Sequence, residues 1–577
     1  MRRSAPHPLS RLGALVFALA LVCTAVATPF AAAASPAATA PLAADAETDR
    51  LAGASDTAAR QEAPPDPDSD VIGWEDGYWH NESVDVDQSD GLSDEELDAY
   101  VARAMARVEY LREAEFDSDV PVSTITREEY RNRSSGGGSG DASRTEYNRW
   151  NDQVWEGLFI VGESTGSGDA IGETTGSSVL GFYSPTRDEI TIVTDSPDSP
   201  TINNATLVHE LVHALQDQRY DLTNETYRAS TQDGDLAVDG VVEGEANYIE
   251  TNYAQRCGAE WECVDTPQAG GSGGGGGSGP NLGVLLTLLN PYSDGPVYVN
   301  EIVEEGGWDA FEERFQDPPA SSEQVIHRTD EAPRSIEFTD RGTNGWSTFP
   351  RDNPQLGQNG SDTVGEASIY AMFWYQAREY QADTINPNGL FQTSDPYDTY
   401  NYDAEPSKGW ANDRLFPYRT GEDDDAEYGY VWVTEWDTET DAREFHDTYL
   451  RMLDAHDVRE TDEGYYVVSD GPFADAFLVR LDGERVTIVN GPTVDDVQDI
   501  RPGLEPGEAD PDGTGDGSDV TETTTADETG GTGDDTGDNA DAGDDTSGTT
   551  EVSGVGFGFG VATAAVAIAG LLARRRR

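Results

Sequence analysis

Two histidines and a glutamate lie close together in the segment TLVHELVHALQDQ, residues 206–218. On an α-helix, residues four apart lie one above the other at about 6 Å, so His209 and His213 can direct both imidazoles at one ion. Glu210 lies about 100° further round the helix, where it can reach a water on that ion without binding the ion itself. This HExxH spacing predicts a zinc site with a general base. The alternative is an amphipathic helix whose two histidines only pack in the core.

A catalytic zinc ion usually has a third protein ligand and one open coordination position. The best candidate lies in VVEGEANYIE, residues 241–250, on the next predicted helix. Together the two segments resemble the gluzincin metallopeptidases, whose second zinc helix often reads glutamate, glycine, any residue, alanine. By that resemblance Glu243 is the third ligand, and Glu245, about 200° away on the same helix, is the runner-up. The alternative is an ordinary acidic helix face, and the spacing from His213 is longer than in many gluzincins.

Further groups are expected to orient the ligands and to stabilise charge in the reaction. Asp217 and Asp239 are candidates to bind the outward nitrogens of the histidines, although each could equally be a solvated acid. His327 or Tyr248 could stabilise the negative charge that develops on a substrate oxygen, although a lone histidine more often has a structural role. A strand ending near Val193 is expected to form the sheet edge along which an extended peptide binds.

The elements around these residues predict an α+β fold. Ser93 begins a helix with a capping box, and VLGFYSPTRDEITIV, residues 179–193, predicts two strands joined by a turn. The HExxH helix follows, with Asn203, Asn204 or Thr206 available as its N-cap. Further segments with helical or strand patterning are the helices 236–254, 363–380 and 438–455 and the strands 428–435, 464–469, 474–481 and 485–490.

Two regions are expected in the folded part of the chain. Residues 71–330 are predicted to form a zincin-like metallopeptidase domain, and residues 331–504 a second, smaller α+β region that packs on it. The glycine-rich run at residues 270–279 is expected to be a flexible insertion in the first domain. Cys257 and Cys263 are close in sequence and are expected to form a disulfide in an oxidising exterior.

The chain is strongly acidic, with 111 acidic against 36 basic residues and a net charge of −75. Self-repulsion of this size destabilises a compact state in dilute buffer, but in molar salt the Debye length falls to about 3 Å and the repulsion is screened. Lys408 is the single lysine, so the basic set is almost all arginine. This composition indicates a protein from a salt-rich environment. It excludes nucleic acid as a partner, because phosphate binding needs a basic face.

Both ends of the chain carry segments typical of export and anchoring. Residues 1–35 combine a basic start, an apolar run and small residues, which predicts a secretory signal peptide. Residues 36–70 and 505–552 are predicted to be a disordered spacer and an acidic low-complexity stalk. Residues 553–577 hold about 20 uncharged residues before a run of arginines, which predicts one transmembrane helix with the arginines in the cytoplasm.

As a whole, the sequence resembles a family of haloarchaeal cell-surface proteins with an HExxH ectodomain, an acidic threonine-rich stalk and a PGF-CTERM-like tail. In that tail class an archaeosortase removes the membrane segment and attaches a lipid anchor, although Val555–Gly556–Phe557 stands here where Pro-Gly-Phe is expected. The preferred hypothesis is a surface-anchored, zinc-dependent metallopeptidase in which Glu210 takes a proton from the water that attacks a peptide carbonyl. The alternative is a non-catalytic surface protein with a structural or vestigial zinc site.

Overall fold

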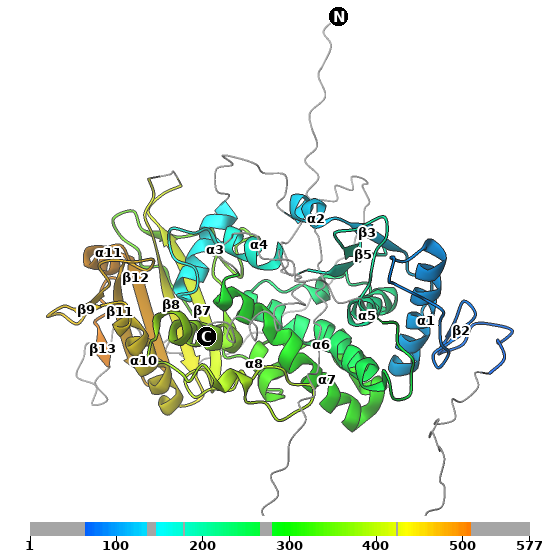
Figure 1. Ribbon diagram of the computed structural model, residues 1–577. Helices are drawn as coiled ribbons and strands as arrows, with labels where there is room; N and C mark the ends of the chain where they lie inside the picture. The colour runs from blue at the N-terminus through cyan, green and yellow to red at the C-terminus, as the bar shows by residue number, and fades with distance from the viewer. Residues whose placement is uncertain (1–63, 135–145, 177–178, 266–279, 423–424, 509–577) are drawn as a thin grey trace, which may run out of the picture.

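The computed structural model describes residues 64–134, 146–176, 179–265, 280–422 and 425–508 (Figure 1). These residues form a mixed α+β structure, as predicted. The predicted signal peptide, most of the spacer, the glycine-rich insertion, most of the stalk and the predicted transmembrane segment lie outside the described residues. Within the described ranges, no helix combines the length and the apolar character needed to span a bilayer.

The N-terminal part is built on α1 (Asp94–Arg112). Ser93 caps this helix and forms the predicted capping box with Glu96. Three acidic residues in its first turn complement the positive end of the helix dipole. The other elements of this part are short, and they are β1 (Trp74–Glu75), β2 (Tyr78–Trp79), α2 (Arg127–Ser134), α3 (Glu146–Gly157) and α4 (Ser167–Gly176).

A small sheet packs on the HExxH helix through a shared apolar core. Its strand order is β3 (Val122–Ile125), β5 (Glu189–Val193), β4 (Gly181–Ser184), with β3 parallel and β4 antiparallel to β5. The two strands predicted over residues 179–193 are confirmed. The prediction that the strand ending near Val193 forms the sheet edge is wrong, because β3 pairs with β5 from the other side. The edge strand of this hairpin is β4.

Three consecutive helices form the middle of the molecule (Figure 1). They are α5 (Asn204–Tyr220), α6 (Gln232–Arg256) and α7 (Leu282–Gln316). Asn203 caps α5 by accepting a hydrogen bond from the backbone of Ala205, so the first of the three possible caps is the one used. In Figure 1, α6 and α7 lie between the large C-terminal sheet at one end and α1 at the other.

Glycines let α6 and α7 approach each other closely. A Cβ on Gly244 would lie 2.8 Å from the carbonyl carbon of Gly295, and a Cβ on Gly295 would lie 2.6 Å from the carbonyl oxygen of Gly240. No side chain fits at such distances, so the contact requires glycine on both helices. Gly240 and Gly244 are one helical turn apart and therefore share a face of α6. Beyond the end of this helix, Cys257 and Cys263 form the predicted disulfide.

The second part of the structure is dominated by a large sheet with strand order β6-β7-β8-β12-β11-β10-β9, in which β13 also pairs with β11. The predicted strands at 428–435, 474–481 and 485–490 and the helix at 438–455 are present. β7 was not predicted, because its Asn, Asp and Pro residues are uncommon in strands. The elements not yet given are η1 (Glu225–Tyr227), α8 (Ser322–His327), β6 (Ser347–Thr348), α9 (Gly365–Tyr375), η2 (Gln376–Tyr380), η3 (Gly389–Phe391), β7 (Trp410–Arg419), β8 (Tyr428–Trp436), α10 (Glu439–Asp454), β9 (Arg459–Glu460), β10 (Tyr466–Val467), β11 (Ala476–Asp482), β12 (Arg485–Gly491), α11 (Val494–Ile500) and β13 (Gly507–Glu508).

One hydrophobic core joins the first part of the chain to this sheet. It contains Trp155 of α3 and Phe159 just after it, together with Trp432 of β8 and Phe477 of β11. The ring of Phe159 lies 5.6 Å from the ring of Phe477. The end of α3 is therefore anchored against the C-terminal sheet.

Candidate metal centre

α5 places His209, Glu210 and His213 in the interior of the protein. The exposed fractions of the three residues are 0%, 0% and 3%, and apolar residues of the same helix pack around them. The rings of the two histidines lie 4.8 Å apart between centroids, as expected for residues one turn apart. The helix thus brings the two imidazoles together at one point, as the HExxH spacing predicts.

Glu243 of α6 completes this group. Its Oε2 atom lies 3.1 Å from Nε2 of His209 and 3.2 Å from Nε2 of His213. A tetrahedral zinc ion with bonds of about 2.0 Å holds its ligand atoms about 3.3 Å apart, so these distances match the edges of such a tetrahedron. Two imidazole nitrogens and a carboxylate oxygen are also donors that zinc accepts. The three predicted ligands therefore come together and fit a zinc ion.

Glu245, the runner-up ligand, is engaged elsewhere. Its carboxylate forms a buried salt bridge with Arg112 of α1 and accepts a hydrogen bond of 2.8 Å from Nε2 of Gln216. Both charged side chains of the salt bridge are at most 2% exposed. Because this carboxylate compensates a buried arginine, it is not free to bind a metal ion. The structure thus selects Glu243 over Glu245.

The outward nitrogens of the two histidines face polar side chains. Nδ1 of His213 lies 2.9 Å from Oε1 of Gln216, and Nδ1 of His209 lies 3.4 Å from Oε2 of Glu250, a long contact with poor hydrogen-bond geometry. Burial lowers the pKa of His209, but its interactions with Glu243 and Glu250 outweigh burial and raise the pKa to about 10. Groups at these nitrogens orient the rings of metal-binding histidines.

These partners are not the ones expected from the sequence. Asp217 accepts a hydrogen bond of 2.8 Å from the hydroxyl of Tyr183, and in the described residues it makes no hydrogen bond to either histidine. Asp239 makes no hydrogen bond to either histidine in the described part of the chain. The observed partners are Gln216, three residues after His213, and Glu250, seven residues after Glu243. Helical periodicity places each partner on the same helix face as the ligand before it, so the spacing could have identified both.

Glu210 is held beside the ligands by the edge strand. The backbone N–H of Tyr183 in β4 donates a hydrogen bond of 2.8 Å to its Oε2 atom. The Oε1 atom is buried and has no hydrogen-bond partner among the described residues. Leaving a buried acceptor unpaired costs about 1–3 kcal/mol, and a bound water would remove that cost. Burial also raises the pKa of Glu210 to about 7.

Tyr292 of α7 is a further residue of the centre, and nothing in the sequence indicated it. Its ring lies parallel to the ring of His209, with 6.1 Å between centroids and 15° between planes. Its hydroxyl forms a hydrogen bond with Glu243. Burial, reinforced by the charge of Glu243, raises the pKa of Tyr292. Tyr292 precedes Gly295 by about one helical turn, so the close approach of α6 and α7 is what brings the tyrosine to the metal ligands.

His327 and Tyr248 are not part of this group. Nε2 of His327 lies 2.9 Å and 3.0 Å from the two carboxylate oxygens of Glu366 in α9. Tyr248 packs its ring against Trp308 and Tyr397, at 5.9 Å and 5.0 Å between centroids. These contacts give neither residue a role at the group formed by His209, Glu210, His213 and Glu243, whereas Tyr292 contacts two of its members.

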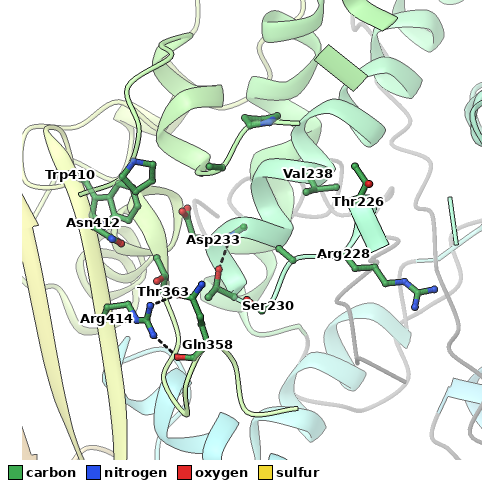
Figure 2. A pocket seen from close by; sticks show the side chains of 16 residues that line it. Thr226, Arg228, Ser230, Asp233, Val238, Gln358, Thr363, Trp410, Asn412 and Arg414 are labelled. Atoms are coloured by element: carbon green, nitrogen blue, oxygen red, sulfur yellow. Dashed lines mark hydrogen bonds between the residues drawn. The ribbon is translucent and has the colours of Figure 1, made fainter. Parts of the chain in front are cut away.

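A pocket of about 460 Å³ opens near the start of α6, at a distance from the metal ligands. Asp233 and Val238 line it from α6, and Trp410 and Arg414 line it from β7 (Figure 2). None of the three candidate metal ligands lines this pocket.

Fold and site together define a buried group of two histidines and a glutamate that could hold a metal ion, formed by two helices beside the edge strand of a small sheet. A family model described as a domain of unknown function (DUF8575) matches residues 353–501. That segment covers most of the large C-terminal sheet and contains none of the three metal ligands. Searches of curated proteins and of solved structures found no match.

Proposed function

We propose that this protein is a zinc-dependent metallopeptidase with a zincin-like fold, in which His209, His213 and Glu243 bind the zinc ion. The observation that carries the proposal is the unpaired, buried Oε1 atom of Glu210 next to the ligand group. A packing helix with two histidines has no need of a buried, unpaired carboxylate oxygen. A metallopeptidase does, because its general base must accept a proton from a water molecule.

A bound zinc ion would supply a Lewis acid that polarises water. Glu210 is positioned to take the proton at Oε1, while the hydrogen bond from Tyr183 fixes Oε2. Burial raises the pKa of this carboxylate above its ordinary value, which favours its accepting a proton. The hydroxyl of Tyr292 lies at Glu243, so it is placed to donate a hydrogen bond to a substrate oxygen beside the zinc ligands.

The proposed substrate is a peptide, and the proposed location is the cell surface. The disulfide between Cys257 and Cys263 favours an oxidising compartment outside the cytosol. The net charge of −75 favours function in concentrated salt. The signal-like residues 1–35 and the membrane-spanning pattern of residues 553–577 support export, membrane anchoring and processing by an archaeosortase.

A second candidate function is structural zinc binding in a non-catalytic surface protein. The observation that favours it is burial, because the side chains of the three ligands are at most 5% exposed. Structural zinc sites are closed by protein, whereas catalytic sites admit a substrate. Only measurement of activity distinguishes a closed centre from one that opens to bind a peptide.

The test compares the wild type with Glu210→Gln and with the exposed control Glu225→Gln in molar salt. Zinc content is measured by elemental analysis, and hydrolysis by a library of quenched fluorescent peptides. We expect one zinc per chain in all three proteins and a loss of about 10²–10⁴-fold in activity in Glu210→Gln alone. Zinc in all three proteins without cleavage in any would establish the structural alternative. A wild type without zinc would refute both functions.

A further inference from the structure

A second group of carboxylates lies far from the zinc ligands, where α3 meets the C-terminal sheet. Glu156 is near the end of α3, Glu163 follows in the next loop, and Asp475 directly precedes β11. One oxygen from each carboxylate lies within 4.8 Å of one oxygen from each of the others. The three residues come from segments more than 300 positions apart in the sequence, so only the tertiary fold brings them together.

Two of these carboxylates are buried without a compensating cation. Glu156 is 6% exposed and Asp475 is 7% exposed, whereas Glu163 lies at the surface. No arginine, lysine or histidine forms an ion pair with any of the three within the described ranges. Burial raises the pKa of Asp475 to about 7, and it also raises the pKa of Glu156 well above its ordinary value. Buried carboxylates are normally paired with a cation or bound to a metal ion.

Two buried amide oxygens give an independent indication of a ligand. Nε2 of Gln153 donates a hydrogen bond of 2.8 Å to Glu156, and Nδ2 of Asn490 donates one of 2.8 Å to Asp475. The oxygen of each of these amides is buried and has no hydrogen-bond partner in the described structure. Gln153 is 7% exposed and Asn490 1%. Each unpaired oxygen is bonded to the same carbon as the nitrogen that contacts the carboxylate, and a half-turn of the amide, which exchanges the two atoms, would direct the oxygen at the carboxylates.

The backbone holds the cluster in place. The N–H of Glu163 donates a hydrogen bond of 3.1 Å to the carbonyl of Pro472, three residues before Asp475. A Cβ on Gly162 would lie 2.5 Å from that same carbonyl oxygen, so glycine is required for the two loops to meet. The carbonyl of Asp475 accepts a hydrogen bond of 2.9 Å from Val468. These contacts fix the carboxylates before any ligand binds.

We propose that Glu156, Glu163 and Asp475 form a calcium site, with the amide oxygens of Gln153 and Asn490 as further ligands. The donor set consists of oxygen alone, which calcium prefers and zinc does not. The carboxylate oxygens lie within 4.8 Å of one another, so all three can reach one calcium ion, whose oxygen ligands lie at about 2.3–2.6 Å. Magnesium demands a near-ideal octahedral shell and loses its waters reluctantly, so a set of donors supplied by the protein alone suits it less. The bound calcium ion ties α3 to the C-terminal sheet, and the proposal does not depend on the zinc centre.

The competing explanation is a proton shared between Glu156 and Asp475, since a buried pair of carboxyl groups can retain one proton. The two explanations differ in what Glu156→Gln does. If a proton is shared, a glutamine replaces a protonated acid, and stability is retained or increased whether or not calcium is present. If calcium binds, the same substitution removes a ligand and abolishes the response to calcium.

The experiment uses the full-length chain, stripped with a chelator, reloaded with one equivalent of zinc and kept in molar NaCl. Calcium chloride is titrated by isothermal calorimetry, and the melting temperature is recorded with calcium, with magnesium and without either ion. The variants are Glu156→Gln, the surface variant Glu163→Gln, which preserves the buried pair, and Asp169→Asn, which removes one exposed acid of α4 as a matched control.

We expect one calcium ion to bind to the wild type and to Asp169→Asn, and to raise the melting temperature by a few degrees. Magnesium at the same concentration should give a smaller rise. Calcium affinity should fall at least roughly tenfold in Glu163→Gln, because affinity follows the number of charged ligands, and the response should be lost in Glu156→Gln. If Glu156→Gln does not fold, the calcium affinity of Glu163→Gln tests the proposal by itself. Equal calcium binding in the wild type and Glu163→Gln, or none in the wild type, would overturn the proposal.

Discussion

Two groups of candidate metal ligands in the described structure, His209–His213–Glu243 and Glu156–Glu163–Asp475, differ in their donor atoms. At the zinc ligands, one carboxylate oxygen lies between two imidazole nitrogens at 3.1 Å and 3.2 Å. At the Glu156 cluster every donor is an oxygen, and the three carboxylates lie within 4.8 Å of one another. Imidazole nitrogens favour a transition-metal ion such as zinc, whereas a set of oxygens alone favours a harder ion such as calcium. Acidity alone therefore says little about which ion a cluster binds.

The clusters also differ in how the chain assembles them. The zinc ligands come from two consecutive helices, and two of the three are one helical turn apart. The oxygen cluster needs the end of α3, the following loop, the segment before β11 and a residue of β12. The first arrangement is encoded by local spacing and the second only by the completed fold. A sequence can therefore reveal the zinc ligands but not the oxygen cluster.

The sharpest test of the zinc cluster compares Glu243→Ala with Glu245→Ala, two neighbouring acids of α6. Glu243→Ala removes a ligand and should weaken zinc binding by more than about 100-fold, since even losing a partner of a ligand costs about 10–100-fold. Glu245→Ala should retain zinc but lose about 3 kcal/mol of the free energy of unfolding, because it leaves the buried Arg112 without its main partner. Zinc affinity is measured by competition with a chelating dye, and stability by guanidinium unfolding. Zinc loss in Glu245→Ala with zinc retained in Glu243→Ala would mean that the ligand assignment is reversed.

The helix contact that carries Tyr292 to the zinc ligands is tested by Gly244→Ala. The added methyl group would lie 2.8 Å from the backbone of Gly295, so the two helices must separate. We expect a loss of about 1–3 kcal/mol in the free energy of unfolding, as for other overpacked sites. The matched control is Gly172→Ala in α4, where the methyl group meets nothing within 4 Å and should stabilise the helix by about 0.5–1 kcal/mol. Equal guanidinium midpoints for the two variants would show that the close contact does not matter.

The sequence predicted the parts of the proposed zinc site that follow from helical periodicity. His209, His213 and Glu210 are related by spacing within one helix, and Glu243 was placed by its resemblance to a known motif. Tyr292 could not be predicted, because its position depends on glycine contacts between helices that are far apart in sequence. For the same reason the oxygen cluster has no sequence signature.

The expected sheet edge was wrong, and the expected role of His327 found no support, because the sequence lacks information on pairing. Alternating apolar residues identify β5 as a strand, but they do not show that β3, more than 60 residues earlier, pairs beside it. Likewise, the sequence does not show where the side chain of a lone histidine points. His327 follows a recognisable helix start, yet its partner Glu366 lies on another helix and is found only in the fold.

His327 and Glu366 form a third pair of a nitrogen donor and a carboxylate, but no second histidine joins them. We expect this pair to bind a proton and not a metal ion. Burial lowers the pKa of His327, but the hydrogen bond and charge of Glu366, with a smaller contribution from Asp403, outweigh burial and raise the pKa. A histidine whose pKa is raised in the folded state stabilises the protein below its unfolded pKa of about 6.5, and this stabilisation is lost as the pH rises through the folded pKa.

The test is the difference in the free energy of unfolding between the wild type and His327→Gln across this pH range. The difference should be about 1 kcal/mol at pH 6, a modest value because the side chain is 23% exposed and partly screened by water, and it should shrink as the medium becomes alkaline. The control is His446→Gln, whose partner Asp447 is 53% exposed, and which should change stability by less than about 0.5 kcal/mol at any pH. Both are measured by guanidinium unfolding in molar salt with zinc in excess. A difference for His327→Gln that grows with pH would contradict the assignment, because a charged imidazole held by Glu366 can only lose its stabilising effect when it loses its proton.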